Sequence, residues 1–225
     1  MDTSSSAVED YLKAIYQLQG QDEAVSTTEL AHRLHLTPAS VTGMIKRLAA
    51  DDPPLVEYER YQGVTLTASG ERLALAVVRR HRLLELFLER ALNYSWDEVH
   101  AEADRLEHAI SERLEDRIAA WLGEPATDPH GDPIPTKDGR VAPSACRRLS
   151  DLEEGEVGTV ASALDEDPAV LRYLAEKGLV PGATVTVTNR VPFGGPVVVK
   201  VGLHSPEPLS KEITDSLCIS ADDRA

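Results

Sequence analysis

The chain of 225 residues has few aromatic residues and no long apolar segment. Aromatics make up only 4% of the residues, so a buried core must be aliphatic, which the 42% hydrophobic residues allow. No apolar run approaches the roughly 18 residues that suggest a membrane span. Residues 1–6 also lack the basic and apolar regions of a signal peptide. We therefore expect a cytoplasmic protein.

Cysteine is scarce as well. Cys146 and Cys218 lie far apart in the chain and form no C-x-x-C pair. This spacing indicates neither a disulfide framework nor a cysteine metal site. A reducing cytosol suits such a chain.

The chain has fewer basic than acidic residues. The net charge is −15, and none of the segments 1–75, 76–145 and 146–225 is basic overall. Contacts to phosphates need local positive charge, so the composition excludes an indiscriminate nucleic-acid binder. DNA binding would require a local basic patch, a dimer, or a bound cation that offsets some of the carboxylates.

The first 72 residues have the pattern of a winged helix-turn-helix domain. Apolar residues at helical spacing predict a helix over residues 6–20. Ser26 with Glu29 predicts the start of a short second helix, and Thr37 with Pro38 predicts a third. Alternating residues on either side of Gly63 then predict a hairpin. Three helices and a two-stranded ribbon favour DNA binding, and the alternative is a small helical domain that binds protein.

In this domain the helix from Pro38 to about Ala50 is the expected recognition helix. Small polar and basic side chains on it can bond phosphates or base edges, and a small apolar one can contact a thymine methyl. For Arg47 the alternative is an ordinary surface cation. The predicted DNA-binding residues are Thr37, Ala39, Ser40, Thr42, Lys46, Arg47 and, near the wing tip, Arg60.

Residues 73–140 predict a helical domain. One long helix is expected from Thr67 to Leu92 and another from Trp96 to Leu122. Their apolar surfaces are too large for one hairpin to bury, which indicates a partner subunit. Residues 123–145 contain five prolines and three glycines and resemble a linker.

Residues 141–225 predict a small β-barrel. Strands are expected at Val157–Ala163, Thr184–Thr188 and Val197–Val201, with a helix from Pro168 to Lys177 that ends at Gly178. The fold class is therefore mainly α with a small β part, in three domains: residues 1–72, 73–140 and 141–225.

Carboxylates and imidazoles recur at helical spacing in the helical domain. On a continuous helix Asp104, Glu107 and His108 would share one stripe, with His100 at its edge. His81 and Glu85 lie four residues apart on the long helix, and Asp10 lies beside apolar residues on the first helix. Such groups can converge on a divalent cation, but solvated polar faces and helix salt bridges use the same spacings.

These residues resemble the diphtheria toxin repressor family, which includes the manganese transport regulators. The resemblance covers residues 6–136 in order and spacing, and the remainder resembles the family's SH3-like C-terminal domain. It implies a homodimeric, metal-activated transcriptional regulator, in the first place a repressor, that binds double-stranded operator DNA. The matching stretches are Glu9–Leu12 with Ile15 and Tyr16, Arg80–Glu85, Val99–His108 and Asp128–Pro135.

The resemblance also implies two metal sites in each subunit. One would comprise Asp10, Asp104, Glu107 and His108, and a neighbouring one His81, Glu85 and His100, unless His81 joins a paired-metal arrangement as in the manganese branch. That branch has a further carboxylate on the first helix where this chain has Lys13. The lysine disfavours a two-metal cluster of that type in this chain.

The iron branch uses sulfur ligands where Asp10 and Asp104 stand in this chain. Oxygen ligands favour Mn²⁺, with Fe²⁺ as the alternative. From the C-terminal domain, Asp165, Glu166 and Asp167 are candidates for a further ligand. Otherwise their charges favour the start of the following helix.

Two other classes of function stay open at this point. A cluster of histidines and carboxylates also suits a metal-dependent enzyme, although the chain has no nucleophile elbow, no phosphate-binding glycine loop and no H-E-x-x-H motif. The other possibility is a metal-buffering or interaction protein whose N-terminal domain does not bind DNA.

Overall fold

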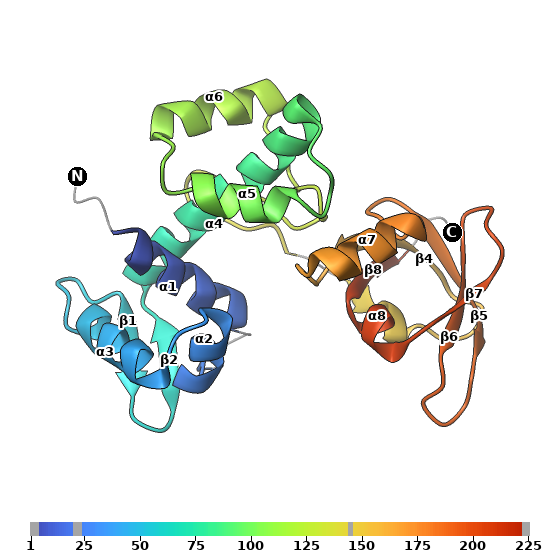
Figure 1. The fold of residues 1–225 in the computed structure, drawn as a ribbon, viewed down its shortest axis with the longest axis horizontal. Helices are drawn as coiled ribbons and strands as arrows, with labels where there is room; N and C mark the ends of the chain where they lie inside the picture. The colour runs from blue at the N-terminus through green and yellow to red at the C-terminus, as the bar shows by residue number, and fades with distance from the viewer. Residues whose placement is uncertain (1–4, 20–23, 144–145, 222–225) are drawn as a thin grey trace. The chain divides into compact units, whose positions relative to one another are not determined.

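The computed structural model describes residues 5–19, 24–143 and 146–221. Its elements confirm the predicted class, because helices dominate the first part of the chain and strands the last part (Figure 1). The chain divides into two compact units, residues 1–80 with 135–140 and residues 81–134 with 141–225. Among the described residues, no helix is both long enough and apolar enough to cross a membrane.

The first unit contains the predicted winged helix-turn-helix. Its elements are α1 (Ser6–Leu18), α2 (Thr27–Arg33), α3 (Pro38–Ala49), β1 (Val56–Glu59) and β2 (Gly63–Leu66). Ser26 caps α2 through a reciprocal pair of hydrogen bonds with Glu29. The side chain of Thr37 caps α3, which has Pro38 in its first turn. Strands β1 and β2 pair in an antiparallel hairpin.

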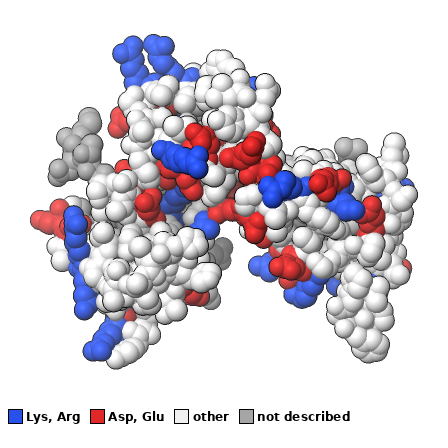
Figure 2. Space-filling view, in the orientation of Figure 1, with Lys and Arg blue, Asp and Glu red and all other residues white. Residues whose placement is uncertain are grey.

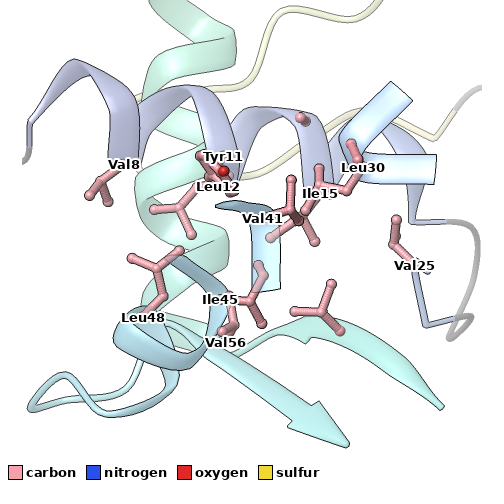
Figure 3. Close-up of a cluster of buried hydrophobic side chains, with 14 residues drawn as sticks. Val8, Tyr11, Leu12, Ile15, Val25, Leu30, Val41, Ile45, Leu48 and Val56 are labelled. Atoms are coloured by element: carbon pink, nitrogen blue, oxygen red, sulfur yellow. The ribbon is translucent and has the colours of Figure 1, made fainter. Parts of the chain in front are cut away.

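The core of this winged helix-turn-helix, called the head below, is aliphatic apart from Tyr11 (Figure 3). Helix α1 contributes Leu12 and Ile15, which are fully buried, and α3 contributes Val41 and Ile45. Each such side chain stabilises the fold by about 1.5–3 kcal/mol when fully buried. The packing of α1 and α3 in one core fixes the position of the recognition helix within the head.

The long helix α4 (Ala68–Leu92) is followed by two shorter helices, α5 (Val99–Leu106) and α6 (Glu112–Leu122). The prediction of one helix from Trp96 to Leu122 is therefore wrong. The chain turns after Leu106, and the Ser111 side chain starts α6 by accepting a hydrogen bond from the Leu114 amide. Glu107 and His108 thus lie at and just beyond the end of α5 and not on a continuous helical stripe.

The segment predicted as a linker contains an ordered loop, residues 128–135. Asp128, His130 and Ile134 are buried in it. The Asp128 carboxylate accepts hydrogen bonds from the amides of His130 and Asp132, at 2.8 and 3.0 Å. Gly131 has a φ of 90°, and a Cβ there would lie 1.9 Å from the Ala161 carbonyl oxygen. Only glycine fits this close approach, so the loop is fixed against the C-terminal domain.

The C-terminal domain contains the strands β3 (Arg147–Arg148), β4 (Val157–Ala163), β5 (Thr184–Arg190), β6 (Val197–Val201), β7 (Glu207–Leu209) and β8 (Leu217–Ala221), with a 3₁₀ turn at Leu149–Asp151 and helices α7 (Pro168–Glu176) and α8 (Lys211–Asp215). The strands form a six-stranded antiparallel sheet in the order β3-β8-β4-β5-β6-β7. Register shifts after Val160 and Val187 bend two of the pairings. The predicted β4, β5, β6 and α7 are present, whereas β3, β7, β8 and α8 were not predicted.

The two cysteines are joined, which their spacing in the sequence did not indicate. Cys146 and Cys218 form a disulfide with their Cα atoms 5.6 Å apart, although 72 residues separate them in sequence. Strands β3 and β8 pair side by side and bring them together. The pairing depends on the strand order, which the spacing of two cysteines does not reveal.

Candidate metal centre

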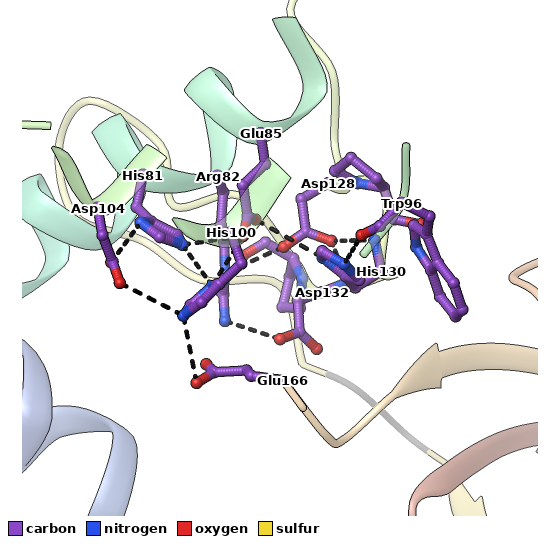
Figure 4. Close-up of polar contacts among 12 residues, drawn as sticks. His81, Arg82, Glu85, Trp96, His100, Asp104, Asp128, His130, Asp132 and Glu166 are labelled. Carbon is purple, nitrogen blue, oxygen red and sulfur yellow. Dashed lines mark hydrogen bonds and ion pairs between the residues drawn. The ribbon is translucent and has the colours of Figure 1, made fainter. Parts of the chain in front are cut away.

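Helices α4 and α5 bring three ligand atoms together (Figure 4). His81 and Glu85 lie one turn apart on α4, and His81 Nε2 is 2.9 Å from Glu85 Oε1. His100, near the start of α5, places its Nδ1 3.0 Å from His81 Nε2 and 3.1 Å from Glu85 Oε1. Two imidazole nitrogens and one carboxylate oxygen therefore face a common point.

These spacings fit a divalent cation. Adjacent ligands around an octahedral ion with bonds of about 2.1 Å lie about 3.0 Å apart, which is the separation of these three atoms. Two imidazoles and carboxylates also form a donor set that suits first-row divalent metals. His81 and Glu85 are almost fully buried, so an ion bound there would compensate an otherwise costly buried charge.

The other nitrogen of His81 faces the second predicted set of ligands. His81 Nδ1 is 2.6 Å from Glu107 Oε2 and 3.3 Å from Asp104 Oδ1. Glu107 Oε1 is in turn 3.5 Å from His108 Nε2. A neutral imidazole has one N–H, so when Nε2 serves as a ligand, Nδ1–H donates to a carboxylate and orients the ring.

Six of the seven predicted ligands therefore lie in one unit and are linked by short contacts: His81, Glu85, His100, Asp104, Glu107 and His108. Asp10 is exposed on α1 and belongs to the other unit. Its role as a ligand stays a prediction.

The C-terminal domain contributes one acidic side chain to this cluster. Glu166 Oε2 is 3.5 Å from His100 Nε2 (Figure 4). The other two acidic candidates accept local hydrogen bonds at the start of α7. Asp165 accepts from the Asp167 amide at 2.8 Å, and Asp167 accepts from the Ala169 amide at 2.7 Å. Glu166 is therefore the candidate that faces the metal centre.

Sequence reasoning gave no role to the polar residues of the loop 128–135. His130 Nδ1 is 3.7 Å from Glu85 Oε2, and Glu85, Asp128 and His130 form a second buried group of ligand type. Arg82 lies 3.4 Å from Asp128 and 3.1 Å from Asp132. The pattern Asp128-Pro-His130-Gly-Asp132 supported the family resemblance, but nothing in it showed that the loop returns to Glu85.

His130 is held on its other side by Trp96. Its Nε2 is 3.1 Å from the Trp96 carbonyl oxygen, and its ring stacks on the indole with centroids 5.3 Å apart. The indole N–H donates to the Pro129 carbonyl oxygen at 3.0 Å. Trp96 therefore fixes the orientation in which His130 faces Glu85.

Burial and neighbouring charges shift the pKa values of this group. Burial acts to raise the pKa of Glu85, but the charge of His81 and hydrogen bonds with the histidines hold it well below its usual range. Burial acts to lower the pKa of His130, but its hydrogen bond to Glu85 and that carboxylate's charge raise it to about 9. Burial and the charge of Glu85 raise the pKa of Asp128 to about 7. Glu85 is thus an ionised carboxylate that attracts positive charge from several sides.

The predicted DNA-binding residues lie on α3 and the wing of the other unit. Ala39, Ser40, Lys46, Arg47 and Arg60 are exposed, and basic side chains project from the part of the head that carries α3 (Figure 2). The side chains of the remaining two make hydrogen bonds to the backbone of α3. Thr37 caps α3, and the half-buried Thr42 donates to the Pro38 carbonyl oxygen at 2.8 Å. At the wing the Arg60 guanidinium lies 4.9 Å from the centre of the exposed Tyr61 ring. Contact of these residues with DNA stays a prediction.

Comparison with known families gives a match over most of the chain. Residues 3–64 match the iron dependent repressor N-terminal DNA binding domain. Residues 67–136 match the iron dependent repressor metal binding and dimerisation domain, and residues 147–220 match the FeoA domain. The three matches follow the predicted order of head, helical domain and small C-terminal domain. The predicted limits of those domains stay a prediction.

Individual relatives agree with these matches. The chain is 34% identical to the iron-dependent repressor IdeR of Mycobacterium leprae, over 86% of this chain and 88% of the relative. Among solved structures, a manganese-dependent transcriptional repressor in complex with manganese has 43% identity and a TM-score of 0.87, covering 95% of this chain and 99% of that one. The structure of ScaR with bound Zn²⁺ has 29% identity and a TM-score of 0.81, covering 96% and 99%.

The comparisons confirm the resemblance seen in the sequence and the predicted function of metal-dependent transcriptional regulation. The six linked ligands lie within the stretch matched by the metal binding and dimerisation domain, residues 67–136, whereas Asp10 and Glu166 lie outside it. The chain belongs to the iron-dependent repressor family, which includes the diphtheria toxin repressors and joins a DNA-binding domain to a metal-binding and dimerisation domain.

Proposed function

We propose that this protein binds operator DNA as a homodimer when Mn²⁺ occupies two sites in each subunit, and that it represses genes of metal homeostasis. The observation that carries this proposal is the convergence of His81 Nε2, Glu85 Oε1 and His100 Nδ1 within 3.1 Å of one another. Glu166 near His100 completes this site from the C-terminal domain.

The choice of metal rests on the ligand atoms. All seven predicted ligands offer nitrogen or oxygen and none offers sulfur, which favours Mn²⁺ over softer ions. A related structure is described as a manganese-dependent repressor with manganese. Fe²⁺ is the second candidate, because the same ligand types accept it and other relatives are named iron-dependent repressors.

The other site joins the head to the helical domain. We assign Asp10 on α1 to it, together with Asp104, Glu107 and His108. Without a cation these carboxylates repel one another, which loosens α1. A bound divalent ion supplies the positive charge that holds them together.

Fixed heads are needed because recognition helices of a dimer must enter major grooves about 34 Å apart or a multiple of it. Coupling of this kind between a metal site and a DNA-binding site would change the affinity for DNA by roughly 5- to 150-fold.

The remaining expectations follow from the family. A dimerisation domain supports a homodimer, and on α6 the large apolar side chains Leu114 and Trp121 are exposed, by 45% and 60%. We place the protein in the cytoplasm, where it meets DNA. We assign it no catalytic activity, because its relatives are named as repressors and regulators.

A gel-shift titration with a pool of random duplexes tests the proposal, with Mn²⁺ in one arm and a chelator in the other. We expect binding in Mn²⁺ that is lost in chelator, and selection from the pool then gives the operator. Equal binding in both arms would make the cluster structural. Binding in neither arm would favour a metal-buffering or interaction protein.

A further inference from the structure

The disulfide lies at the edge of the C-terminal sheet. Cys146 immediately precedes β3, which has only two residues and lies at one end of the strand order. Two ladder pairs hold β3 to β8, Arg147 with Ile219 and Arg148 with Cys218. Such a short edge strand makes few backbone hydrogen bonds, so the Cys146–Cys218 bond adds a covalent attachment to these pairs and to the ion pair of Arg147 with Glu156.

The two sulfur atoms differ in access. Cys218 is 6% exposed, whereas Cys146 is half-buried. Cys146 also lines a cavity of about 380 Å³, together with Leu152, Val157 and Ile219. An incoming thiolate attacks the sulfur that it can reach, so the structure favours attack at Cys146 with Cys218 as the leaving group.

Strand β8 connects the disulfide to the metal centre. Cys218 pairs with Ser162 on β4, and Leu217 pairs with Ala163. The next residue, Leu164, donates its amide hydrogen to the Ser216 carbonyl oxygen at 2.7 Å. Glu166, close to His100, follows two positions later.

The same end of β4 also holds the loop 128–135. The Ala163 amide donates to the His130 carbonyl oxygen at 2.9 Å. The end of β4 that pairs with β8 therefore helps to position two side chains near the candidate metal centre, Glu166 and His130.

We propose that Cys146 and Cys218 form a reversible thiol–disulfide switch that controls how firmly the C-terminal domain holds Glu166 at the site of His81, Glu85 and His100. The effect on metal binding rests on the proposed function, whereas the switch itself does not. In the cytoplasmic location proposed above, a disulfide is usually transient or redox-sensing and not a permanent staple, which agrees with this role.

The reductant is a dithiol. Its thiolate attacks Sγ of Cys146, the Cys146–Cys218 bond breaks, and Cys218 leaves as a thiolate that takes up a proton. The second thiol of the reductant, as a thiolate, then attacks the reductant's own sulfur in the mixed disulfide and releases Cys146, which is also protonated. The protein gains two electrons and two protons, and the dithiol loses them and becomes a cyclic disulfide. A low-molecular-weight disulfide reverses the exchange.

Reduction leaves β3 attached by its two ladder pairs and by the ion pair of Arg147 with Glu156, so we expect it to detach from β8 more often. Strand β8 then becomes the edge of the sheet and holds the end of β4 less firmly. Glu166 loses its fixed position, and the affinity of the site for Mn²⁺ falls.

The first measurement detects the switch in the full chain. The protein is incubated with oxidised or reduced glutathione or with dithiothreitol, free thiols are alkylated, and the mass is determined. We expect no alkylation after oxidised glutathione and two modified cysteines after dithiothreitol. Hydrogen exchange of residues 146–148 and 217–221 should rise in the reduced form. Two free thiols under every condition would overturn the switch.

The second measurement is a calorimetric titration with MnCl₂ of both forms, after the reductant has been removed without oxygen. We expect the reduced form to bind at least about fivefold more weakly at one site, the lower end of the usual range of coupling. The variants C146S and C218S should each behave as the reduced form in any buffer. Glu166→Gln should bind as weakly as the reduced form and should not respond to redox state, although its cysteines still cycle.

The outcomes separate the two proposals. Equal Mn²⁺ affinity of the oxidised and reduced wild type would overturn the coupling while the metal site stands. Failure of both forms to bind Mn²⁺ would overturn the metal assignment and the coupling together, and the alkylation result would still decide whether the switch exists.

Discussion

A carboxylate lies on each side of the His81 ring, with Glu107 at 2.6 Å from Nδ1 and Glu85 at 2.9 Å from Nε2. The residue therefore contacts members of both predicted metal sites. Because a neutral ring has a proton on one nitrogen only, a ligand bond at Nε2 directs the N–H at Nδ1 toward Glu107. The tautomer of His81 thus connects the two predicted sites.

Asp104 is the most direct residue to test, because it contacts both histidines, His81 at 3.3 Å and His100 at 3.6 Å. We expect Asp104→Ala to weaken Mn²⁺ binding by at least about tenfold, a loss seen even for outer-shell partners. Metal-dependent DNA binding should fall with it, and the dimer should stay intact. Calorimetry, gel shift and sedimentation measure the three quantities.

The matched control is Glu102→Ala on the same helix, since Glu102 pairs only with Arg105 among the ion pairs found on α5 in the described structure. It should bind Mn²⁺ as the wild type does. If Asp104→Ala retains full activation by Mn²⁺, the proposed site is wrong.

His130 predicts a pH dependence of stability in the metal-free protein. Its pKa is raised to about 9 in the folded state, above an ordinary value of about 6.5. The folded state therefore binds more protons than the unfolded state between these values, and the free energy of unfolding falls as the pH rises through this window. The raised pKa of Asp128, about 7, makes stability fall with rising pH in a lower window, from about 4 to 7.

Urea unfolding in the presence of chelator at pH 6 and pH 9.5 measures this effect. We expect His130→Gln to be less stable than the wild type by on the order of 2 kcal/mol at pH 6 and by much less at pH 9.5. The exposed His204 provides the control, His204→Gln. A difference between wild type and His130→Gln that does not change with pH would contradict the interpretation.

At the scale of elements, the loop 128–135 has the largest consequence for the site. The sequence pattern of five prolines and three glycines in residues 123–145 indicates a linker. The structure instead uses Gly131 to place the backbone against Ala161, which brings His130 to Glu85. Local composition shows that a segment is irregular, but it does not show which distant strand the segment packs on.

Gly131→Ala tests that contact. An added Cβ would lie 1.9 Å from the Ala161 oxygen, whereas at Gly155, with a similar φ of 88°, nothing lies within 4 Å. Both alanine variants suffer the strain of positive φ, on the order of 1 kcal/mol. We expect Gly131→Ala to lose at least about twice as much stability as Gly155→Ala and to weaken Mn²⁺ binding. Equal losses in chemical denaturation would argue against the close approach.

The helical elements show where sequence reasoning works and where it fails. Ser26 and Glu29 predicted the start of α2 because a capping box is a local interaction. The break between α5 and α6 was missed, because residues 107–111 contain neither glycine nor proline and Ser111 alone marks the new start. Glu107 and His108 therefore do not lie on the predicted helical stripe, yet His81 still contacts Glu107.

At the scale of the whole molecule, family resemblance carried most of the site prediction. Six of the seven proposed ligands lie together in one unit. Spacing along α4 and α5 places His81 with Glu85 and His100 with Asp104, but it does not show that the two pairs face each other. Likewise, Cys146 and Cys218 pair because β8 lies beside β3, and 72 residues of sequence between them give no sign of it.

The net charge of −15 gives the metal a role in the whole molecule. Binding to DNA requires that acidic surfaces not dominate near the phosphates. Under the proposed function, a protein of this composition would gain both positive charge and a fixed arrangement of its heads when divalent ions bind. The proposed regulation therefore depends on an ion among these particular side chains.

Anomalous diffraction from crystals grown with Mn²⁺, recorded at the manganese absorption edge, locates that ion directly. We predict a peak bonded to His81 Nε2, Glu85 and His100 Nδ1, and a second peak beside Asp104, Glu107 and His108. A map from fully loaded crystals with no anomalous peak among these residues would show that this cluster does not bind Mn²⁺.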